Sequence, residues 1–361
     1  MPLVPMKQLL DEAAKVGYGI GAFNVNNMEQ IQAIMQACKE TLSPVIIQAS
    51  RGALKYSNLI YLKKLMEAAV IENPEIPIAM HLDHGNSLAT CKQAIELGFT
   101  SVMIDASLKE DGKEVAGYEY NVETTRSVVE YAHQHGVTVE AELGALGGIE
   151  DGHGAGLAAD DTTHLTDPDQ VVDFVQKTGC DCLAVAIGTS HGAYKTLRYD
   201  KDGNALPPAL ALDRIEKIEK NLEAAGFKNY PLVMHGSSSV PQELVDQINK
   251  YGGKMKATMG IPMTDIQFGI KRGVRKINVD TDGRLAITAA IRKVLYENPE
   301  KFDPRDYLKP AREALYKVIL GKVKDFGQAG HAKDYAPMSL EDMKKIYAKG
   351  SSSCGCCCGK S

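Results

Sequence analysis

The segment Ile76-Pro-Ile-Ala-Met-His-Leu-Asp-His-Gly85 begins as an apolar run and ends in polar side chains. Continuous apolar runs without polar alternation are typical of parallel strands that are buried on both faces. Most of seven further candidate strands share this character, and stretches with helical periodicity separate most of them. The eight predicted strands are residues 18–25, 44–49, 76–81, 101–105, 138–143, 182–188, 231–235 and 274–279.

The predicted helices begin and end at residues that favour helix termini. Asn26 or Asn27 precedes the first helix, Pro168 stands in the first turn of another, and several helices end at glycine. The clearest helical stretches are residues 28–40, 117–135, 167–177, 212–225 and 282–296.

The number of strand–helix units determines the predicted fold. Eight units within about 300 residues favour a closed (β/α)8 barrel, the TIM barrel, over an open doubly wound sheet, which is the alternative. No Gly-x-Gly-x-x-Gly follows the first strand, which argues against a dinucleotide-binding fold. We therefore predict an α/β protein with a single barrel domain at residues 1–349, which includes additional C-terminal helices, and a Cys-rich tail at residues 350–361.

Composition and charge exclude several classes of protein. The chain has 361 residues, and its 41 Lys and Arg against 46 Asp and Glu give a net charge of −5, which excludes a globally basic nucleic-acid-binding protein. No apolar run approaches the roughly 20 residues that span a bilayer, and the first residues lack a signal-peptide pattern. We therefore expect a cytoplasmic protein with no membrane or nucleic-acid partner. We assign no role to the tail cysteines Cys354, Cys356, Cys357 and Cys358.

Histidines followed by glycine recur at the carboxyl ends of three predicted strands, where a (β/α)8 barrel has its active site. His84 follows the third strand, His191 the sixth and His235 the seventh. Three imidazole nitrogens with one open position suit a catalytic zinc ion. The alternative is that they are structural histidines. Two further His-Gly pairs lie elsewhere, and there we expect His135 to mark a helix terminus and His153 to be a surface residue of a long loop.

Acidic side chains accompany these histidines. Asp83 precedes His84, Asp105 ends the fourth strand, and Glu140 and Glu142 share one face of the fifth. Buried carboxylates in such number indicate a metal site or a catalytic role. Ion pairs with Lys or Arg are the alternative.

Two neighbouring loops suit phosphate groups. Gly236-Ser-Ser-Ser239 follows the seventh strand and Asn278-Val-Asp-Thr-Asp-Gly-Arg284 the eighth, and each leads towards a helix whose N-terminus favours an anion. A plain flexible turn is the alternative for the serine run. A second phosphate would bind near Ser50 and Arg51 or near Arg284, so we expect a bisphosphate as substrate.

In combination, four segments resemble the metal-dependent, class II fructose-bisphosphate aldolase family. They are His81-Leu-Asp-His-Gly-Asn86, Ala186-Ile-Gly-Thr-Ser-His-Gly-Ala-Tyr-Lys195, His235-Gly-Ser-Ser-Ser239 and Asn278-Val-Asp-Thr-Asp282. The resemblance covers nearly the whole chain. It implies reversible cleavage of D-fructose 1,6-bisphosphate to dihydroxyacetone phosphate and D-glyceraldehyde 3-phosphate, in glycolysis, gluconeogenesis or the Calvin cycle. Cleavage leaves an enediolate, whose negative charge a zinc ion would stabilise.

The resemblance also implies a role for each candidate residue. His84, His191 and His235 would hold the catalytic zinc ion, and Asp83 would donate and accept the proton at the aldehyde-derived oxygen. Glu150, on a long Gly-rich loop of the kind that forms active-site lids, would match the base that removes the carbon-bound proton. The other residues would form a second metal position (Asp105 and Glu142), the dihydroxyacetone phosphate site (Gly192, Lys195, Gly236, Ser237, Ser238, Asn278, Val279, Asp280 and Thr281) and the glyceraldehyde 3-phosphate site (Ser50, Arg284 and, from a neighbouring subunit, Arg305).

Assembly and alternative activities complete these expectations. The resemblance implies a homodimer or homotetramer, and it allows two zinc positions and a monovalent cation. An aldolase for tagatose 1,6-bisphosphate, which differs at one stereocentre, is the closest alternative. More distant alternatives are a Schiff-base enzyme with Lys276 as nucleophile, a metallohydrolase, and a non-catalytic barrel that binds a metal or a sugar phosphate.

Overall fold

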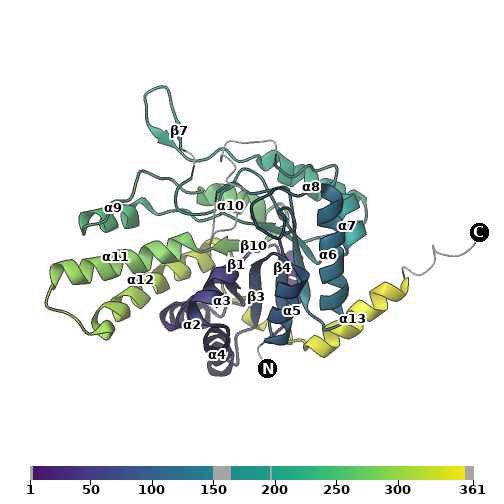
Figure 1. Ribbon diagram of the computed structural model, residues 1–361, viewed down its shortest axis with the longest axis horizontal. Coiled ribbons are helices and arrows are strands. Elements are labelled where there is room, and N and C mark those ends of the chain that lie inside the picture. Colours follow the sequence, from purple (N-terminus) through teal and green to yellow (C-terminus); the bar gives the residue numbers. More distant parts are fainter. Residues whose placement is uncertain (1–2, 149–163, 196, 354–361) are drawn as a thin grey trace, which may run out of the picture.

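Eight parallel strands form a closed barrel at the centre of the molecule (Figure 1). The computed structural model describes residues 3–148, 164–195 and 197–353, with side chains described through residue 349. Neighbouring strands follow the order β1-β10-β9-β6-β5-β4-β3-β2, and β1 closes the ring by pairing with both β10 and β2. The predicted (β/α)8 barrel is therefore confirmed. The barrel strands are β1 (Ile20–Asn24), β2 (Val45–Ser50), β3 (Ile78–Gly85), β4 (Ser101–Ile104), β5 (Thr138–Leu143), β6 (Cys182–Val185), β9 (Leu232–Met234) and β10 (Val274–Val279).

Helices surround the barrel and continue beyond its last strand (Figure 1). A short antiparallel hairpin, β7 (Arg198–Tyr199) and β8 (Ala205–Leu206), follows β6. The helices are α1 (Met6–Val16), α2 (Met28–Thr41), α3 (Arg51–Ser57), α4 (Leu59–Glu72), α5 (Leu88–Glu96), α6 (Tyr118–His133), α7 (Val171–Thr178), α8 (Leu212–Ala224), α9 (Gln242–Lys250), α10 (Met263–Ile270), α11 (Thr281–Glu297), α12 (Pro304–Asp325) and α13 (Leu340–Ser353), with a 3-10 turn at His331–Lys333.

The largest differences from the predicted strand bounds lie at the carboxyl ends of β3 and β6, whereas the other strand ends agree within about two residues. β3 continues past His81 to Gly85, because Leu82 and Asp83 pair with Ala49 and Ser50 of β2. β6 ends at Val185 rather than at residue 188, and Gly188 then turns the chain with a φ of +95°. The polar end of the segment Ile76–Gly85 is therefore part of a strand.

The side chains inside the barrel change from apolar to polar along the strands. At the amino end, Ala22, Ile46 and Ala79 form a cluster with Leu9 and Leu10 of α1, so α1 closes this end of the barrel. Strand side chains alternate with a period of two residues, and the inward positions further along carry polar groups. The buried polar groups towards the carboxyl end include Asn24, Gln48, His81, Asp83, Glu140, Glu142, Lys276 and Asn278.

The predicted C-terminal helices are present and attach at two places. α11 and α12 lie side by side and project from the barrel (Figure 1). α13 instead packs against α6, where Gly136 adopts a φ of +72° and a Cβ atom there would lie 1.9 Å from the carbonyl oxygen of Leu340. Glycine at this position thus allows the close approach of α13. Among the described helices, none combines the length and apolar character needed to cross a bilayer.

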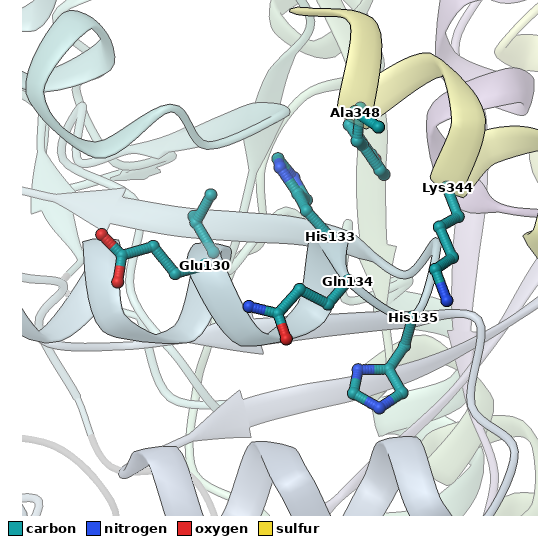
Figure 2. A pocket seen from close by; sticks show the side chains of 8 residues that line it. Glu130, His133, Gln134, His135, Lys344 and Ala348 are labelled. Atoms are coloured by element: carbon teal, nitrogen blue, oxygen red, sulfur yellow. The ribbon is translucent and has the colours of Figure 1, made fainter. Parts of the chain in front are cut away.

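A stacked pair of rings holds α13 in place, beside a groove that His133, His135 and Lys344 line (Figure 2). The imidazole of His133 and the ring of Tyr347 stack with their centroids 3.6 Å apart. Both side chains contact Asp181 Oδ2, with His133 Nε2 at 3.0 Å and the donating hydroxyl of Tyr347 at 2.9 Å. Lys344 and His135 line the groove beside this pair. These contacts attach α13 to the turn between α7 and β6, which contains Asp181.

Replacing Tyr347 tests this attachment. Tyr347→Ala removes the stack and the hydrogen bond, and we expect a loss of about 1–3 kcal/mol in the stability of α13. Tyr347→Phe retains the stack and should lose about 1 kcal/mol, the value of one hydrogen bond. Amide hydrogen exchange in α13, compared with that in β3, measures both changes. Unaltered exchange of α13 in Tyr347→Ala would show that other contacts hold this helix.

Candidate metal centre and active site

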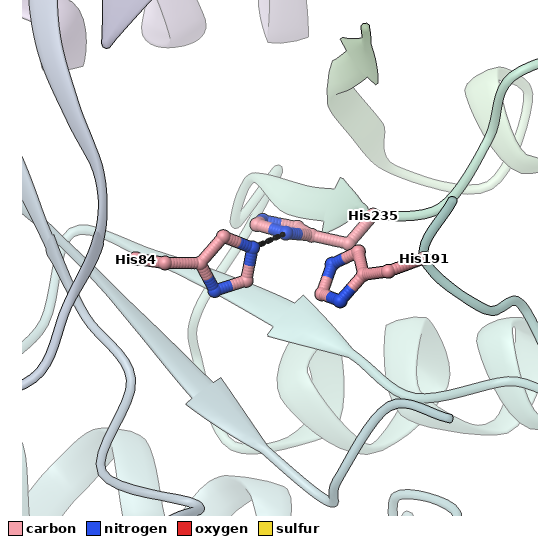
Figure 3. A group of neighbouring side chains, drawn as sticks. All are labelled: His84, His191 and His235. Carbon is pink, nitrogen blue, oxygen red and sulfur yellow. Dashed lines mark hydrogen bonds between the residues drawn. The ribbon is translucent and has the colours of Figure 1, made fainter. Parts of the chain in front are cut away.

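Three imidazoles meet at the carboxyl end of the barrel (Figure 3). His84 lies near the end of β3, His191 in the loop after β6, and His235 directly after β9. Nitrogen atoms of the three rings all lie within 4.8 Å of one another, and all three side chains are buried. The sequence-based prediction that these histidines converge is confirmed.

The backbone at His84 has an unusual conformation that directs its ring. His84 has a φ of +49°, in the left-handed region, and the pairing of β3 with β4 is irregular between Leu82 and Gly85. Such irregularities reorient side chains and are frequent beside active sites. Here the result is that His84 Nε2 lies 3.1 Å from His235 Nδ1. Two nitrogens bound to one tetrahedral zinc ion, each at about 2.0–2.1 Å, lie about 3.3 Å apart. The spacing therefore fits a shared ion.

A second group of potential ligands includes the same His84. One atom each of His84, Asp105 and Glu142 also lies within 4.8 Å of the other two, and His84 Nδ1 is 3.4 Å from Asp105 Oδ2. Burial and the nearby charge of Asp105 raise the pKa of Glu142 well above its usual range. Among the described residues, Glu142 Oε2 has no hydrogen-bond partner. A buried carboxylate oxygen of this kind beside a second carboxylate fits a cation, so the donor set suits the predicted second metal position.

Contacts with Glu140 fix the orientation of the His235 ring, and Lys276 in turn holds Glu140. His235 Nε2 lies 2.8 Å from Glu140 Oε1, and a proton on this nitrogen leaves Nδ1 as the electron-pair donor towards His84. Lys276 Nζ is 2.9 Å from Glu140 Oε2 and donates to Asn278 Oδ1 at 2.7 Å. Lys276, the candidate Schiff-base nucleophile, is thus held in a fully buried ion pair. The sequence analysis assigned no specific role to Glu140.

Asp83 is a buried carboxylate held by three amide groups. Its Oδ2 accepts hydrogen bonds from Asn24 at 3.0 Å and from Gln48 at 3.1 Å, and its Oδ1 accepts one from Asn278 at 3.2 Å. Burial alone would raise the pKa of Asp83, but the charges of His84 and Lys276 outweigh it and hold the pKa below its usual range. Asp83 is therefore ionised and fixed in orientation beside the histidines.

Asn24 and Gln48 were missed by the sequence analysis. Both stand at inward positions near the carboxyl ends of β1 and β2, and this position was the available signal. Neither residue belongs to a distinctive sequence motif. Their contact with Asp83 depends on the register in which β1, β2 and β3 pair, and the sequence does not reveal that register.

A cavity beside the histidines brings most of the predicted substrate-binding residues together. Lys195, which lines it, donates through Nζ to the carbonyl oxygens of Ser190 and Gly236, the latter at 2.8 Å. These two carbonyls belong to the loops that carry His191 and His235. The lining consists of Asn24, Asp83, His191, Gly192, Lys195, Gly236, Ser238, Asn278, Asp280 and Thr281.

Several predicted residues lie at the edge of this cavity or away from it. Ser237 donates into its own loop, to the carbonyl oxygen of Met234 at 3.2 Å, and Val279 is a buried strand residue. Ser50 is the last residue of β2 and accepts a hydrogen bond from the backbone N–H of Ala53 at the start of α3. Arg284 forms an ion pair with Asp280 at 2.6 Å.

Two predicted residues are not part of the described centre. Arg305 lies on α12 with 90% of its side chain exposed and forms an ion pair with Asp303. The predicted contact of Arg305 is with the active site of a neighbouring subunit, so this role stays a prediction. Glu150 lies outside the described residues, as does most of the Gly-rich loop around it.

Comparison with known proteins agrees with this geometry. Residues 4–331 match the family described as fructose-bisphosphate aldolase class-II. A fructose-bisphosphate aldolase of Giardia intestinalis is 54% identical over 347 residues, covering 96% of this chain and 100% of the relative. Relatives with the same description from Nostoc sp. and Pseudomonas aeruginosa are 54% and 50% identical, and each match covers 97% of this chain and at least 97% of the relative.

The chain belongs to the class II fructose-bisphosphate aldolase family. This is a metal-dependent family of lyases, and the two groups of converging ligands agree with that chemistry. Among solved structures, the YdjI aldolase of Escherichia coli K12 is similar, with a TM-score of 0.68 and 27% sequence identity. That match covers 92% of this chain and all of the YdjI chain.

The two ligand groups share His84, and this overlap predicts the effect of removing single ligands. His84→Ala removes one ligand from both groups, so we expect zinc affinity to fall by at least 100-fold, since even changes to residues that only support ligands cost about 10- to 100-fold. His191→Ala leaves His84, Asp105 and Glu142 in place and should retain weaker binding of one ion. Competition of zinc between the protein and a chromogenic chelator measures both affinities.

His133 provides the matched control for these variants, since it is a histidine at the opposite end of the barrel with a partner of its own. His133→Ala should bind zinc as the unaltered protein does. Equal zinc affinity in His84→Ala and the unaltered protein would refute the assignment of the centre.

Proposed function

We propose that this chain catalyses the reversible cleavage of D-fructose 1,6-bisphosphate to dihydroxyacetone phosphate and D-glyceraldehyde 3-phosphate. The observation that supports this most directly is the convergence of His84, His191 and His235 beside the ionised Asp83 and a cavity walled by two candidate phosphate loops. Such a combination supplies a Lewis acid, a proton carrier and an anion site within one cavity.

The ion and the carboxylate have different tasks in this reaction. A divalent ion held by the three histidines would supply a Lewis acid for the negative charge that develops when the carbon–carbon bond breaks. Asp83 takes the proton from the C4 hydroxyl during cleavage and returns it during condensation. The amides of Asn24, Gln48 and Asn278 orient this carboxylate towards the cavity.

The phosphate of dihydroxyacetone phosphate is assigned to the two loops at β9 and β10. Gly236 and Ser238 line one side of the cavity, and Asp280 and Thr281 line the other. Thr281 is also the first residue of α11, a helix of 17 residues, and its N-terminus favours a dianion. Fixing the phosphate here places the ketone end of the substrate next to the histidines.

The second phosphate is assigned to the rim of the cavity. Ser50 and Arg284 from this chain would contact glyceraldehyde 3-phosphate, and Arg305 would reach it from a neighbouring subunit of a homodimer or homotetramer. The exposure of Arg305 on α12 supports a contact outside its own chain. Glu150 would remove the carbon-bound proton from dihydroxyacetone phosphate.

The proposed ion is argued from its ligands, and the proposed location of the protein is argued from its cysteines. We propose zinc, because three imidazole nitrogens with an open position are its usual catalytic ligands, with Asp105 and Glu142 as a second position. The proposal also allows a monovalent cation. Four buried cysteines are unpaired, and this supports a reducing compartment such as the cytoplasm, where the reaction serves glycolysis and gluconeogenesis.

An assay with two sugar bisphosphates tests the reaction and the substrate together. We expect cleavage of fructose 1,6-bisphosphate to exceed that of tagatose 1,6-bisphosphate by at least tenfold in kcat/KM. Activity should disappear with EDTA and return with zinc. Coupled oxidation of NADH measures triose phosphate release. Activity that persists in EDTA, together with an imine trapped by borohydride, would instead identify Lys276 as a nucleophile.

Replacing the proposed proton carrier tests the mechanism separately. Asp83→Asn keeps the size of the side chain but replaces one accepting oxygen with a donating NH2 group, so it cannot carry the proton and retains only part of the hydrogen bonding. We expect kcat to fall by roughly 10²- to 10⁴-fold with little change in KM, as is usual for loss of a general acid–base group. Zinc content, measured on the same preparation, serves as the control. A kcat within twofold of that of the unaltered enzyme would remove Asp83 from the mechanism.

A further inference from the structure

The loop Gly236–Ser239 rests on a carboxylate that does not reach the cavity. Asp282 lies in the first turn of α11 and is completely buried. Its Oδ2 accepts hydrogen bonds from the backbone N–H and the hydroxyl of Ser239, both at 3.0 Å. Its Oδ1 accepts one from the backbone N–H of Val240 at 2.8 Å. One side chain thus holds the end of the loop at three points.

A lysine from the C-terminal helices completes this contact. Lys322 of α12 places its Nζ 2.8 Å from Asp282 Oδ2, and it donates to the hydroxyl of Ser239 at 2.7 Å. Burial opposes ionisation of Asp282, but the adjacent Lys322 outweighs it and lowers the pKa of this carboxyl. Asp282 and Lys322 therefore form a buried ion pair whose hydrogen bonds are directed at the loop.

The conformation that this pair holds is one that the chain would not adopt by itself. Val240 has a φ of +46°, in the left-handed region, where a β-branched residue is strained. Its N–H is the group that donates to Asp282 Oδ1. A strained residue persists only where its surroundings determine its conformation, and here the surroundings are Asp282 and Lys322.

The other side of the loop is closed by tightly packed backbone. The N–H of Ile261 donates to the carbonyl oxygen of Ser238 at 3.1 Å. A Cβ atom on Gly260 would lie 2.2 Å from the carbonyl carbon of Ser239, and one on Gly236 would lie 2.5 Å from the carbonyl oxygen of Ser190. The loop is therefore fixed between this backbone and the ion pair, with Gly236 and Ser238 facing the cavity.

We propose that Asp282 and Lys322 are positioning residues, which hold the Gly236–Ser239 loop in the conformation that binds a phosphate monoester. The inference deepens the proposed function and rests on it, because it assigns this loop to the phosphate of the substrate. The cavity wall, as described, contains neither residue. They act through the loop by preparing its N–H groups before the substrate arrives, which lowers the cost of binding. Through Lys322, α12 thereby contributes to the binding of the phosphate (Figure 1).

Neutralising the carboxylate is the direct test. Asp282→Asn keeps the size of the side chain but replaces an accepting oxygen with a donor, so at most one oxygen remains for Ser239 and Val240. We expect KM for fructose 1,6-bisphosphate and the dissociation constant of inorganic phosphate to rise at least tenfold, while kcat and zinc content change less than threefold. Steady-state kinetics and calorimetric titration of the zinc-loaded enzyme with inorganic phosphate measure these quantities.

Two further variants separate positioning from stability. Lys322→Met leaves all three hydrogen bonds from Ser239 and Val240 to Asp282, so KM should rise only about threefold. Asp181→Asn is the matched control, because Asp181 is also buried and also accepts a backbone N–H, from Val139, but lies at the opposite end of the barrel. It should lower thermal stability and leave KM unchanged. Should Asp282→Asn not fold, Lys322→Met decides the question on the same measurements.

The outcomes distinguish this inference from the proposed function. If the unaltered enzyme cleaves the bisphosphate but Lys322→Met and every folded Asp282 variant match its KM and phosphate affinity, the positioning role is wrong and the function stands. If Asp181→Asn raises KM as much as Asp282→Asn does, the effect is one of general stability and the positioning role is again wrong. An unaltered, zinc-loaded enzyme that neither cleaves the substrate nor binds phosphate refutes the proposed function itself.

Discussion

A negative charge buried at the centre of the barrel imposes the arrangement around it. Glu140 is completely enclosed, and an isolated carboxylate there would be very unfavourable. Lys276 from β10 compensates the charge, and His235 donates to the other oxygen. Because His235 is held in this way, its second nitrogen is turned towards His84. The electrostatic requirement of β5 thus fixes the orientation of a candidate metal ligand that follows β9. The candidate metal centre therefore lies next to a buried ion pair.

Asp83 and Glu142, two of the carboxylates beside the histidines, occupy different environments, and this explains how one small region can combine different roles. Asp83 is surrounded by amide donors and positive charge, so its pKa lies below the usual range. Glu142 faces the like charge of Asp105, so its pKa is raised. Neighbouring groups thus give chemically identical carboxyl groups different pKa values, as is common at sites that both bind ions and transfer protons.

Much of the fold and part of the site could be predicted from the sequence, for reasons that differ between elements. Most strands that are buried on both faces leave apolar runs, whereas β5 and β10 alternate apolar with polar or charged residues and were still located with their observed bounds. The three histidines were found because a strand end, an imidazole and a glycine coincide three times. Asn24, Gln48 and the pair of Asp282 and Lys322 could not be found in this way. Their roles depend on contacts between distant segments, and no local pattern marks an amide or a lysine that faces another strand or helix.

The closure of the barrel has a consequence for how the polypeptide is made. β1 pairs with β10, and the backbone N–H of Gly21 donates to the side chain of Gln328 at 2.8 Å, so residues about 300 positions apart must meet. Contacts of such long range are slow to form because the intervening chain must first be ordered. While the ribosome is still adding the last third of the chain, β1 carries an open hydrogen-bonding edge. Until β10 has been made and pairs with β1, this nascent edge is free to pair with the wrong partner.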